Sequence, residues 1–208
     1  MSTILTSAQS DALATLPGMV VRLGPLRSRL TDEEFEKFCA ENPELRIEMT
    51  SEGVMIIMLP VTPEGSSRNF KLTTRFGAWA EADGTGVGFE SSAGFTLPNG
   101  AKRSPDVSWM RKERWDLLTP AQRNEFTHIC PDFVVELRSK TDRLRTLQKK
   151  MKEYMANGAG LGWLIDPIRH QVHIYHADSS VEILDHPQVI SGEPLLPGFV
   201  LRLDAIID

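Results

Sequence analysis

Residues 131–138 read Pro-Asp-Phe-Val-Val-Glu-Leu-Arg, an apolar run that carries a carboxylate, Glu136, near its end. Such a run is typical of a strand in the middle of a sheet, where an unpaired carboxylate costs several kcal/mol. With the two-residue alternation of a strand, one face carries Asp132, Val134, Glu136 and Arg138. The opposite face carries Phe133, Val135 and Leu137. We therefore expect a partner that compensates Glu136.

A second short segment, Ser-Pro-Asp-Val-Ser-Trp at residues 104–109, carries Asp106 thirty residues before Glu136. Proline cannot donate a hydrogen bond to a sheet, so Asp106 is expected near the start or the edge of a strand. The cheapest partner for two converging carboxylates is a hard divalent cation. The pair therefore predicts a metal-dependent hydrolase that acts on phosphodiesters. An ion pair between Glu136 and Arg138 or a lysine is the structural alternative.

The residues that follow Glu136 predict the fold class. Thr141 or Asp142 can cap a helix that ends near Gly158, a natural C-terminal stop. A further apolar strand follows at residues 161–165. A strand, a helix and a strand in this order favour a parallel pair of strands joined by a crossover helix. We expect an α/β domain with a mixed central β-sheet flanked by helices.

The rest of the chain alternates short strands with helices. Thr31 and Glu34 form a capping box for a first helix, and Gly53 lies in a turn between two apolar strands. An amphipathic helix is expected at residues 67–82, with Phe70 among its apolar residues. The other expected elements are strands at residues 45–49, 54–59, 86–90, 95–97, 106–110, 172–175 and 181–184, and a polar helical stretch at 112–126 that Thr119-Pro120 divides. Residues 1–28 read as a loosely ordered arm, and residues 29–208 as one domain.

The composition is that of a soluble globular protein, with 41% hydrophobic and 25% charged residues among 208. The N-terminus lacks the features of a signal peptide, and no apolar run reaches the roughly 20 residues that span a bilayer. Cys39 and Cys130 have no ligand-like spacing, so we expect neither a disulfide framework nor a zinc site, and the cytoplasm is the expected location. The net charge of −5 counts modestly against a protein that tracks phosphates.

A third acid and a group of cations accompany the two carboxylates. Glu48 lies near the turn at Gly53. Two roles are open for it: an ordinary ion pair, cross-strand or with Arg46 on the same face, and a functional role beside the two carboxylates. The helix expected after Glu136 carries an apolar stripe, and Lys149 points away from that stripe. The basic cluster consists of Lys140, Arg143, Arg145, Lys149, Lys150 and Lys152. Lys150 and Lys152 flank the stripe on either side, and helix phasing alone does not choose which of them reaches the carboxylates.

No other catalytic arrangement competes well with the carboxylate pair in the sequence. It contains no G-x-S-x-G elbow, no P-loop, no G-x-G-x-x-G after a strand and no H-E-x-x-H. The five histidines are mostly in the C-terminal third, where strand alternation divides them between faces. A histidine ligand set is therefore not expected.

Four segments together resemble the Uma-two family of the PD-(D/E)XK, or restriction endonuclease-like, superfamily. They are Ser-Pro-Asp at 104–106, Pro-Asp-Phe-Val-Val-Glu-Leu-Arg-Ser at 131–139, Lys-Met-Lys-Glu-Tyr at 150–154 and Gly-Trp-Leu-Ile-Asp-Pro at 162–167. The resemblance spans about residues 30–205 and also covers Arg-Ile-Glu at 46–48. The superfamily usually has lysine two residues after the glutamate, where this chain has Arg138. In Uma-two proteins the lysine stands four residues before the tyrosine, which corresponds to Lys150.

The resemblance implies a set of roles. Asp106, Glu136 and the Leu137 carbonyl would hold Mg²⁺ or Mn²⁺, and Glu48 would complete the shell directly or through water. Lys150 would position the attacking water or neutralise developing charge. Because arginine does not lose its proton, Arg138 could clamp a phosphate but not serve as a base.

For the substrate, Lys140 and Arg143 are expected beside Arg138 as nucleic-acid contacts. The implied activity is a Mg²⁺-dependent endonuclease acting on DNA, and nuclease domains of this fold often pair as homodimers. The alternative is a catalytically inactive nuclease-fold protein that binds nucleic acid or a protein partner. Steep salt dependence of DNA binding would favour the nuclease.

Overall fold

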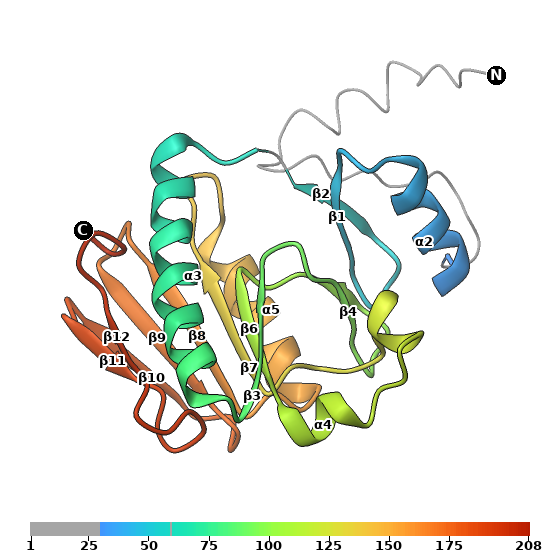
Figure 1. Cartoon of the computed structure of the whole chain (residues 1–208). Coiled ribbons are helices and arrows are strands. Elements are labelled where there is room, and N and C mark those ends of the chain that lie inside the picture. The colour runs from blue at the N-terminus through green and yellow to red at the C-terminus, as the bar shows by residue number, and fades with distance from the viewer. Residues whose placement is uncertain (1–29, 59) are drawn as a thin grey trace, which may run out of the picture.

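A six-stranded mixed sheet forms the centre of the computed structural model, which describes residues 30–58 and 60–208 (Figure 1). Its strand order is β10-β9-β8-β7-β6-β3, with bounds Val181–Asp185, Gln171–His176, Leu161–Asp166, Phe133–Leu137, Val107–Arg111 and Gly86–Glu90. β7 and β8 are parallel, and the other neighbours are antiparallel. The mixed sheet and the strand-helix-strand unit are thus confirmed. The arm expected at residues 1–28 falls outside the described residues.

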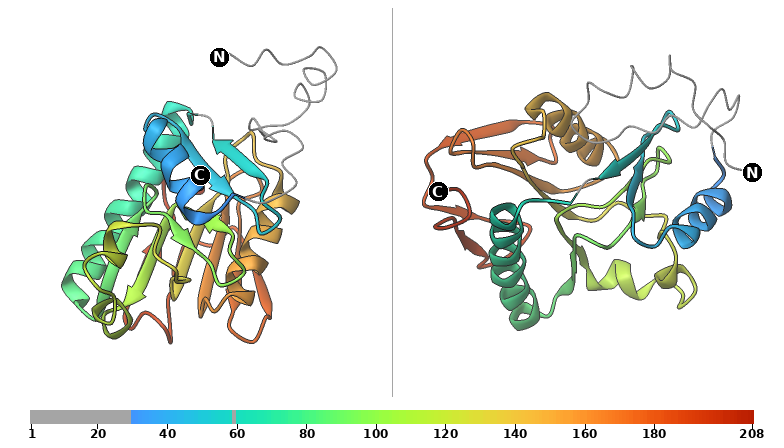
Figure 2. Two further views of the ribbon diagram at one scale, coloured as in Figure 1. Left: turned by 90° about the vertical axis from the view of Figure 1, so that its right-hand side faces the viewer. Right: turned by 90° about the horizontal axis from the view of Figure 1, so that it is seen from above.

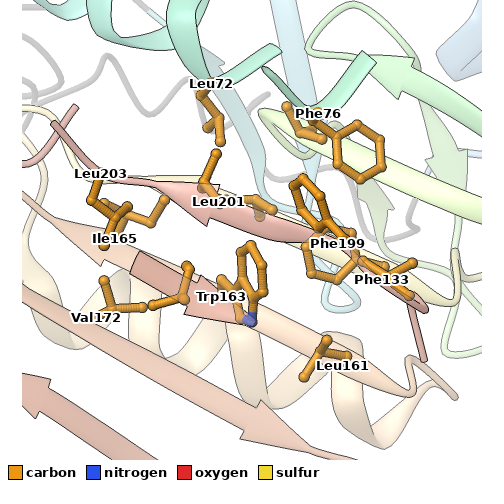
Figure 3. Close-up of a cluster of buried hydrophobic side chains, with 14 of the residues drawn as sticks. Leu72, Phe76, Phe133, Leu161, Trp163, Ile165, Val172, Phe199, Leu201 and Leu203 are labelled. Carbon is orange, nitrogen blue, oxygen red and sulfur yellow. The ribbon is translucent and has the colours of Figure 1, made fainter. Parts of the chain in front are cut away.

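Helices cover both faces of this sheet (Figure 2). α3 (Pro63–Asp83) and the two-stranded ribbon of β11 (Val189–Ser191) and β12 (Val200–Arg202) cover one face. The core of that face includes Leu72, Phe76, Phe133, Val135, Trp163, Phe199 and Leu201 (Figure 3). α5 (Leu144–Ala156) covers the other face, where its buried side chains pack with Val134 and Leu164. No helix in the described part of the chain is long and apolar enough to cross a membrane.

The alternation along β7 decides the face on which Glu136 lies. Phe133 and Val135 enter the core under α3, whereas Val134 enters the core under α5, as the sequence predicts. Glu136 is therefore on the α5 side, where it is only 5% exposed. The candidate site residues lie on this side of the sheet, at the end where β7 stops.

A smaller sheet flanks that end of the α5 face. Its order is β2-β1-β5-β4, with bounds Met55–Met58, Arg46–Met49, Lys102–Arg103 and Phe95–Thr96. α2 (Asp32–Glu41) begins at the expected capping box and packs Phe35 against Ile47 and Met49. The chain passes from β5 to β6 through only three residues, 104–106, and this short link brings the small sheet close to Asp106.

Three expectations about local structure are wrong. The stretch at 112–126 is not one divided helix: α4 spans Lys112–Asp116, and a single 3₁₀ turn spans Gln122–Asn124. Thr119 interrupts the stretch because a residue before proline avoids the helical region. It does open the second part as expected: the Gln122 N–H donates to Thr119 Oγ1 at 3.3 Å, and the Thr119 N–H donates to Gln122 Oε1 at 2.9 Å. α5 begins at Leu144, without a side-chain cap, because the Asp142 carboxylate accepts the Ser139 N–H instead. Phe70 is 72% exposed, because it lies roughly 160° around α3 from the buried Leu72.

Gly162 on β8 allows α5 to approach the sheet closely, and it supports a prediction about stability. A Cβ at this position would lie 2.5 Å from Met151 Cε and 3.4 Å from Met155 Sδ. Gly162→Ala is expected to destabilise the fold by about 1 kcal/mol, the low end for overpacking because the flexible end of Met151 can shift, measured by urea denaturation. Gly160→Ala is the control, because its Cβ would meet neighbours only at 3.5 Å or more. Equal effects of the two substitutions would contradict the close-approach explanation.

Candidate active site

Asp106 and Glu136 meet at the edge of two neighbouring strands. β6 and β7 pair antiparallel with Val107 opposite Val135, so Asp106 comes next to Glu136 in the register. The Leu137 N–H donates to Asp106 Oδ2 at 2.7 Å. The sequence prediction that these two carboxylates converge is therefore reproduced, and backbone pairing is the cause.

Lys150 joins this pair from α5. Its Nζ lies 2.7 Å from Glu136 Oε1 and 2.7 Å from Glu48 Oε1, and its side chain is 12% exposed. The Tyr154 hydroxyl, one helical turn later, donates to Glu136 Oε1 at 3.1 Å. Helix phasing leaves open whether Lys150 or Lys152 reaches the carboxylates. Lys152 is exposed, so Lys150 is the lysine that does so. The same contact is also the Glu136–lysine ion pair that the sequence offers as a purely structural role.

Glu48 is held by three donors at once. Besides Lys150, the Ser104 N–H donates to its Oε1 at 3.0 Å, and Arg103 Nη1 donates to its Oε2 at 3.1 Å. Glu48 is 3% exposed, and Arg46, its ordinary alternative partner, instead reaches the Ser91 hydroxyl. Glu48 thus belongs to the cluster by position, but both of its oxygens are already engaged.

The acids of the cluster titrate in opposite directions. Burial raises the pKa of Asp106, partly offset by the Leu137 N–H. Burial is also the main cause that raises the pKa of Glu136. Lys150 lowers this pKa and Asp106 raises it further, and the net value is about 8. Burial would raise the pKa of Glu48 as well, but Lys150 and Arg103 outweigh it and lower that pKa. Glu48 is therefore the firm anion, whereas ionisation of Asp106 and Glu136 is costly without a compensating cation.

The Asp106–Glu136 pair fits a hard divalent cation. No described residue donates a hydrogen bond to Asp106 Oδ1 or Glu136 Oε2. Carboxylate oxygens are the ligands that Mg²⁺ prefers, and a cation would relieve the burial cost of both acids. The amide of Leu137, whose carbonyl is an expected ligand, already holds Asp106 through its N–H.

Glu48 does not join the other two acids around one point. Among the described residues, no three acidic, histidine or cysteine side chains are grouped as a ready ligand set. Lys150 lies between Glu48 and Glu136, and its ammonium holds the two carboxylates 2.7 Å away on either side. The geometry thus separates two roles. Asp106 and Glu136 form the candidate ligand pair for a metal ion, whereas Glu48 holds Lys150.

The three cations expected to contact nucleic acid have different surroundings. Arg138 does not pair with Glu136: its Nη1 donates to the buried Asp166 at 2.8 Å, and its Nε donates to the Asp142 carbonyl. Lys140 is exposed and lies 3.5 Å from Glu64. Arg143 is exposed at the start of α5 and lines a surface hollow with Arg145 and Lys149. Arg138 thus braces the edge of the sheet, while Lys140 and Arg143 face outward.

Sequence reasoning missed Arg103 and Asp142. Arg103 is 7% exposed and contacts Glu48, while Asp142 lies close enough to Asp106 to add to the rise of its pKa. Arg103 immediately precedes the Ser-Pro-Asp segment, and its proximity to Asp106 in the sequence was the available signal. Asp142 gave no such signal, because it reads as a helix cap.

Comparison with known proteins agrees with this architecture. Residues 32–204 match the model of the Uma2 family, described as "Putative restriction endonuclease". A crystal structure of "a putative nuclease belonging to DUF820" from Anabaena variabilis aligns with a TM-score of 0.69 and 20% sequence identity, covering 86% of this chain and 97% of that chain. None of the curated proteins compared with the chain matches it. The family match spans most of the sequence, and the chain therefore belongs to the Uma2 (Uma-two) family and has the restriction endonuclease-like fold.

Proposed function

We propose that this protein is a Mg²⁺- or Mn²⁺-dependent endonuclease that hydrolyses phosphodiester bonds in DNA. The observation that carries the proposal is the pairing of Asp106 with Glu136 beside the Lys150 ammonium, at the outer end of the sheet. Both acids are held where their charge is costly, and both keep one oxygen without a hydrogen-bond donor from the described residues. Family membership supports the same activity.

Asp106 and Glu136, together with the Leu137 carbonyl, would hold the metal ion. When bound, such an ion polarises the phosphate and lowers the pKa of water. The Lys150 ammonium, fixed by two carboxylates, offers a compact positive charge to the phosphate or the attacking water. Tyr154 keeps Glu136 oriented through its hydroxyl. Glu48 holds Lys150, and any direct contact between Glu48 and the ion would require it to release a present donor.

The surface around the start of α5 offers an approach for the DNA backbone. Lys140, Arg143, Arg145 and Lys149 are exposed there and concentrate positive charge in a chain with a net charge of −5. No described carboxylate lies within ion-pair distance of Arg145 or Lys149. Arg138, which is held by Asp166 and the Asp142 carbonyl, would be the third cation to contact a phosphate. This local field compensates for the acidic total charge, since phosphates respond mainly to nearby cations.

Two further properties belong to the proposal. The described cysteines, Cys39 and Cys130, are both free, which suits a reducing cytoplasm. A homodimer would place two such sites on one duplex, one for each strand.

Calorimetry of Mg²⁺ and Mn²⁺ binding tests the metal site. The wild type is expected to bind in the micromolar to millimolar range, and Asp106→Ala and Glu136→Ala are expected to abolish binding. Lys152→Ala, an exposed change on α5, is the control and should bind as the wild type does. Binding should be followed by cleavage of plasmid and linear DNA. Absence of metal binding by the wild type would leave the Glu136–Lys150 contact as a structural ion pair and favour a non-catalytic binding protein.

The salt dependence of DNA binding tests the proposed surface. Arg145→Gln with Lys149→Gln is expected to reduce the slope of log affinity against log salt by about 1–2, since each phosphate contact contributes about 0.9. Lys112→Gln is the control, because Lys112 follows β6 at the end opposite Asp106. Fluorescence anisotropy between low and moderate salt measures the slopes. Identical slopes for wild type and double variant would move the DNA interface elsewhere.

A further inference from the structure

Arg103 occupies a buried position between two acids that come from different elements. Its Nη1 donates to Glu48 Oε2 at 3.1 Å, and its Nε donates to Glu153 Oε2 at 2.6 Å. The side chain of Arg103 is 8% exposed, and those of Glu48 and Glu153 are 4% and 15% exposed. A guanidinium can satisfy two carboxylates because its donors form a rigid planar fork, which an ammonium lacks.

The two acids connect Arg103 to Lys150 by two routes. Glu48 lies on β1 and holds the Lys150 Nζ directly at 2.7 Å. Glu153 is on α5, three residues after Lys150. The contact of Arg103 with Glu153 therefore fixes the helical turn that carries Lys150. β5, which carries Arg103, thereby connects the small sheet to α5 across the site.

A second layer of contacts holds Glu153 in turn. Asn99 Nδ2 donates to Glu153 Oε1 at 3.0 Å, and the Asn99 N–H donates to Asn157 Oδ1 at 2.8 Å. Both oxygens of Glu153 are thus occupied, and the acid is not free to turn toward another cation. Buried networks in which every member has a partner favour a single arrangement.

We propose that Arg103 is a positioning residue that orients Glu48 so that Glu48 holds the Lys150 ammonium beside Glu136. The importance of this arrangement for catalysis rests on the proposed nuclease function, but the arrangement itself does not. Without the guanidinium, Glu48 Oε2 loses its only described donor, and Glu48 can rotate away from Lys150. Lys150 then keeps Glu136 as its one described carboxylate partner instead of two.

The chemical reactivity of Lys150 tests the proposal without reference to activity. Brief acetylation of the metal-free protein with an amine-selective reagent, followed by mass spectrometry, gives a rate for each lysine. Arg103→Met is expected to raise the Lys150 rate roughly tenfold, the effect of losing one charge-assisted hydrogen bond, while Lys149 and Lys152 keep their rates. Arg103→Lys is expected to give an intermediate rate, and it decides the matter if Arg103→Met does not fold.

A double-mutant comparison separates positioning from general bracing. In a Glu48→Gln background, replacing Arg103 should change the Lys150 rate little further, because the route through Glu48 is already broken. An unchanged Lys150 rate in the folded Arg103 variants would overturn the proposal. A rise shared by all buried lysines, including Lys102, would also overturn it, because it would indicate loosening of the whole fold.

Kinetics then distinguish this proposal from the nuclease function. If the wild type cleaves DNA, Arg103→Lys is expected to lower kcat by up to about 10²-fold with KM unchanged, because it misplaces a group that acts only on the reaction. A rise in KM alone would contradict the positioning role. If the wild type cleaves no nucleic acid while the Lys150 rates follow the expectation, the proposed function fails and the positioning role stands.

Discussion

Glu136→Gln is expected to abolish metal-dependent cleavage while making the metal-free protein more stable at neutral pH. The carboxylate is 5% exposed and lies beside Asp106, so its ionisation costs free energy in the folded state. Glutamine keeps an acceptor for Lys150 and Tyr154 but removes the charge that would bind a cation. Loss of a group that stabilises transition-state charge typically lowers kcat by roughly 10²–10³-fold, and loss of the metal as well should exceed that.

The stability difference between Glu136→Gln and the wild type should depend on pH. The pKa of Glu136 is raised from 4.5 to about 8, so the folded protein retains a proton that the unfolded chain releases. The stability associated with the protonated acid is present below about pH 4.5 and is lost as pH rises through about 8. The advantage of Glu136→Gln over the wild type should therefore grow across this window, measured by urea denaturation in a chelating buffer.

A surface acid provides the control for both measurements. Glu125→Gln lies on an exposed loop and should leave cleavage and the pH profile of stability unchanged. Added Mg²⁺ should raise the melting temperature of the wild type and not that of Glu136→Gln. A Glu136→Gln protein that is less stable than the wild type at pH 8, or that still cleaves DNA with Mg²⁺, would show that Glu136 is only a structural partner of Lys150.

Lys150→Met is expected to lower both stability and activity. Among the described donors, the substitution leaves Glu136 with only the Tyr154 hydroxyl, whereas Glu48 keeps Arg103 and the Ser104 N–H. Removal of one partner of a buried ion pair costs about 3–5 kcal/mol, because the remaining charge stays buried. The cost should fall as pH decreases through about 8, where Glu136 takes up a proton. Cleavage should fall by roughly 10²–10³-fold if the ammonium stabilises developing charge.

Lys152, on the same helix, is the control that separates the effect of losing a charge from the effect of losing it at position 150. Lys152→Met removes an exposed charge from α5 and should change stability by less than about 0.5 kcal/mol and leave cleavage intact. Lys150→Arg keeps the charge but replaces a compact ammonium by a larger planar group, so it should fold better than Lys150→Met without recovering full activity. Equal behaviour of Lys150→Met and Lys152→Met would remove Lys150 from the site.

The difference between the two lysines shows where sequence reasoning reaches its limit. Helix periodicity placed both beside the apolar stripe of α5, and only the family motif favoured Lys150. The deciding factor is the position of Glu48, which arrives from β1 of a separate small sheet. Sequence patterns report which face of an element is buried, but not which element approaches that face. The same limit applies to Arg138, which was expected near Glu136 and pairs instead with Asp166 on β8.

By itself, the sequence determined the elements whose signals are local. The alternation along residues 133–137, the capping box at Thr31 and the strand-helix-strand order gave β7, α2 and the parallel pair of β7 and β8, because these depend on neighbours along the chain. The convergence of Asp106 and Glu136 also followed, since adjacent strands align their ends. Only the tertiary structure decided that Glu48 holds Lys150 and that Arg103 holds Glu48. Those contacts join residues 55 and more positions apart, and the energy of a buried charge depends on which partner packing brings within about 3 Å.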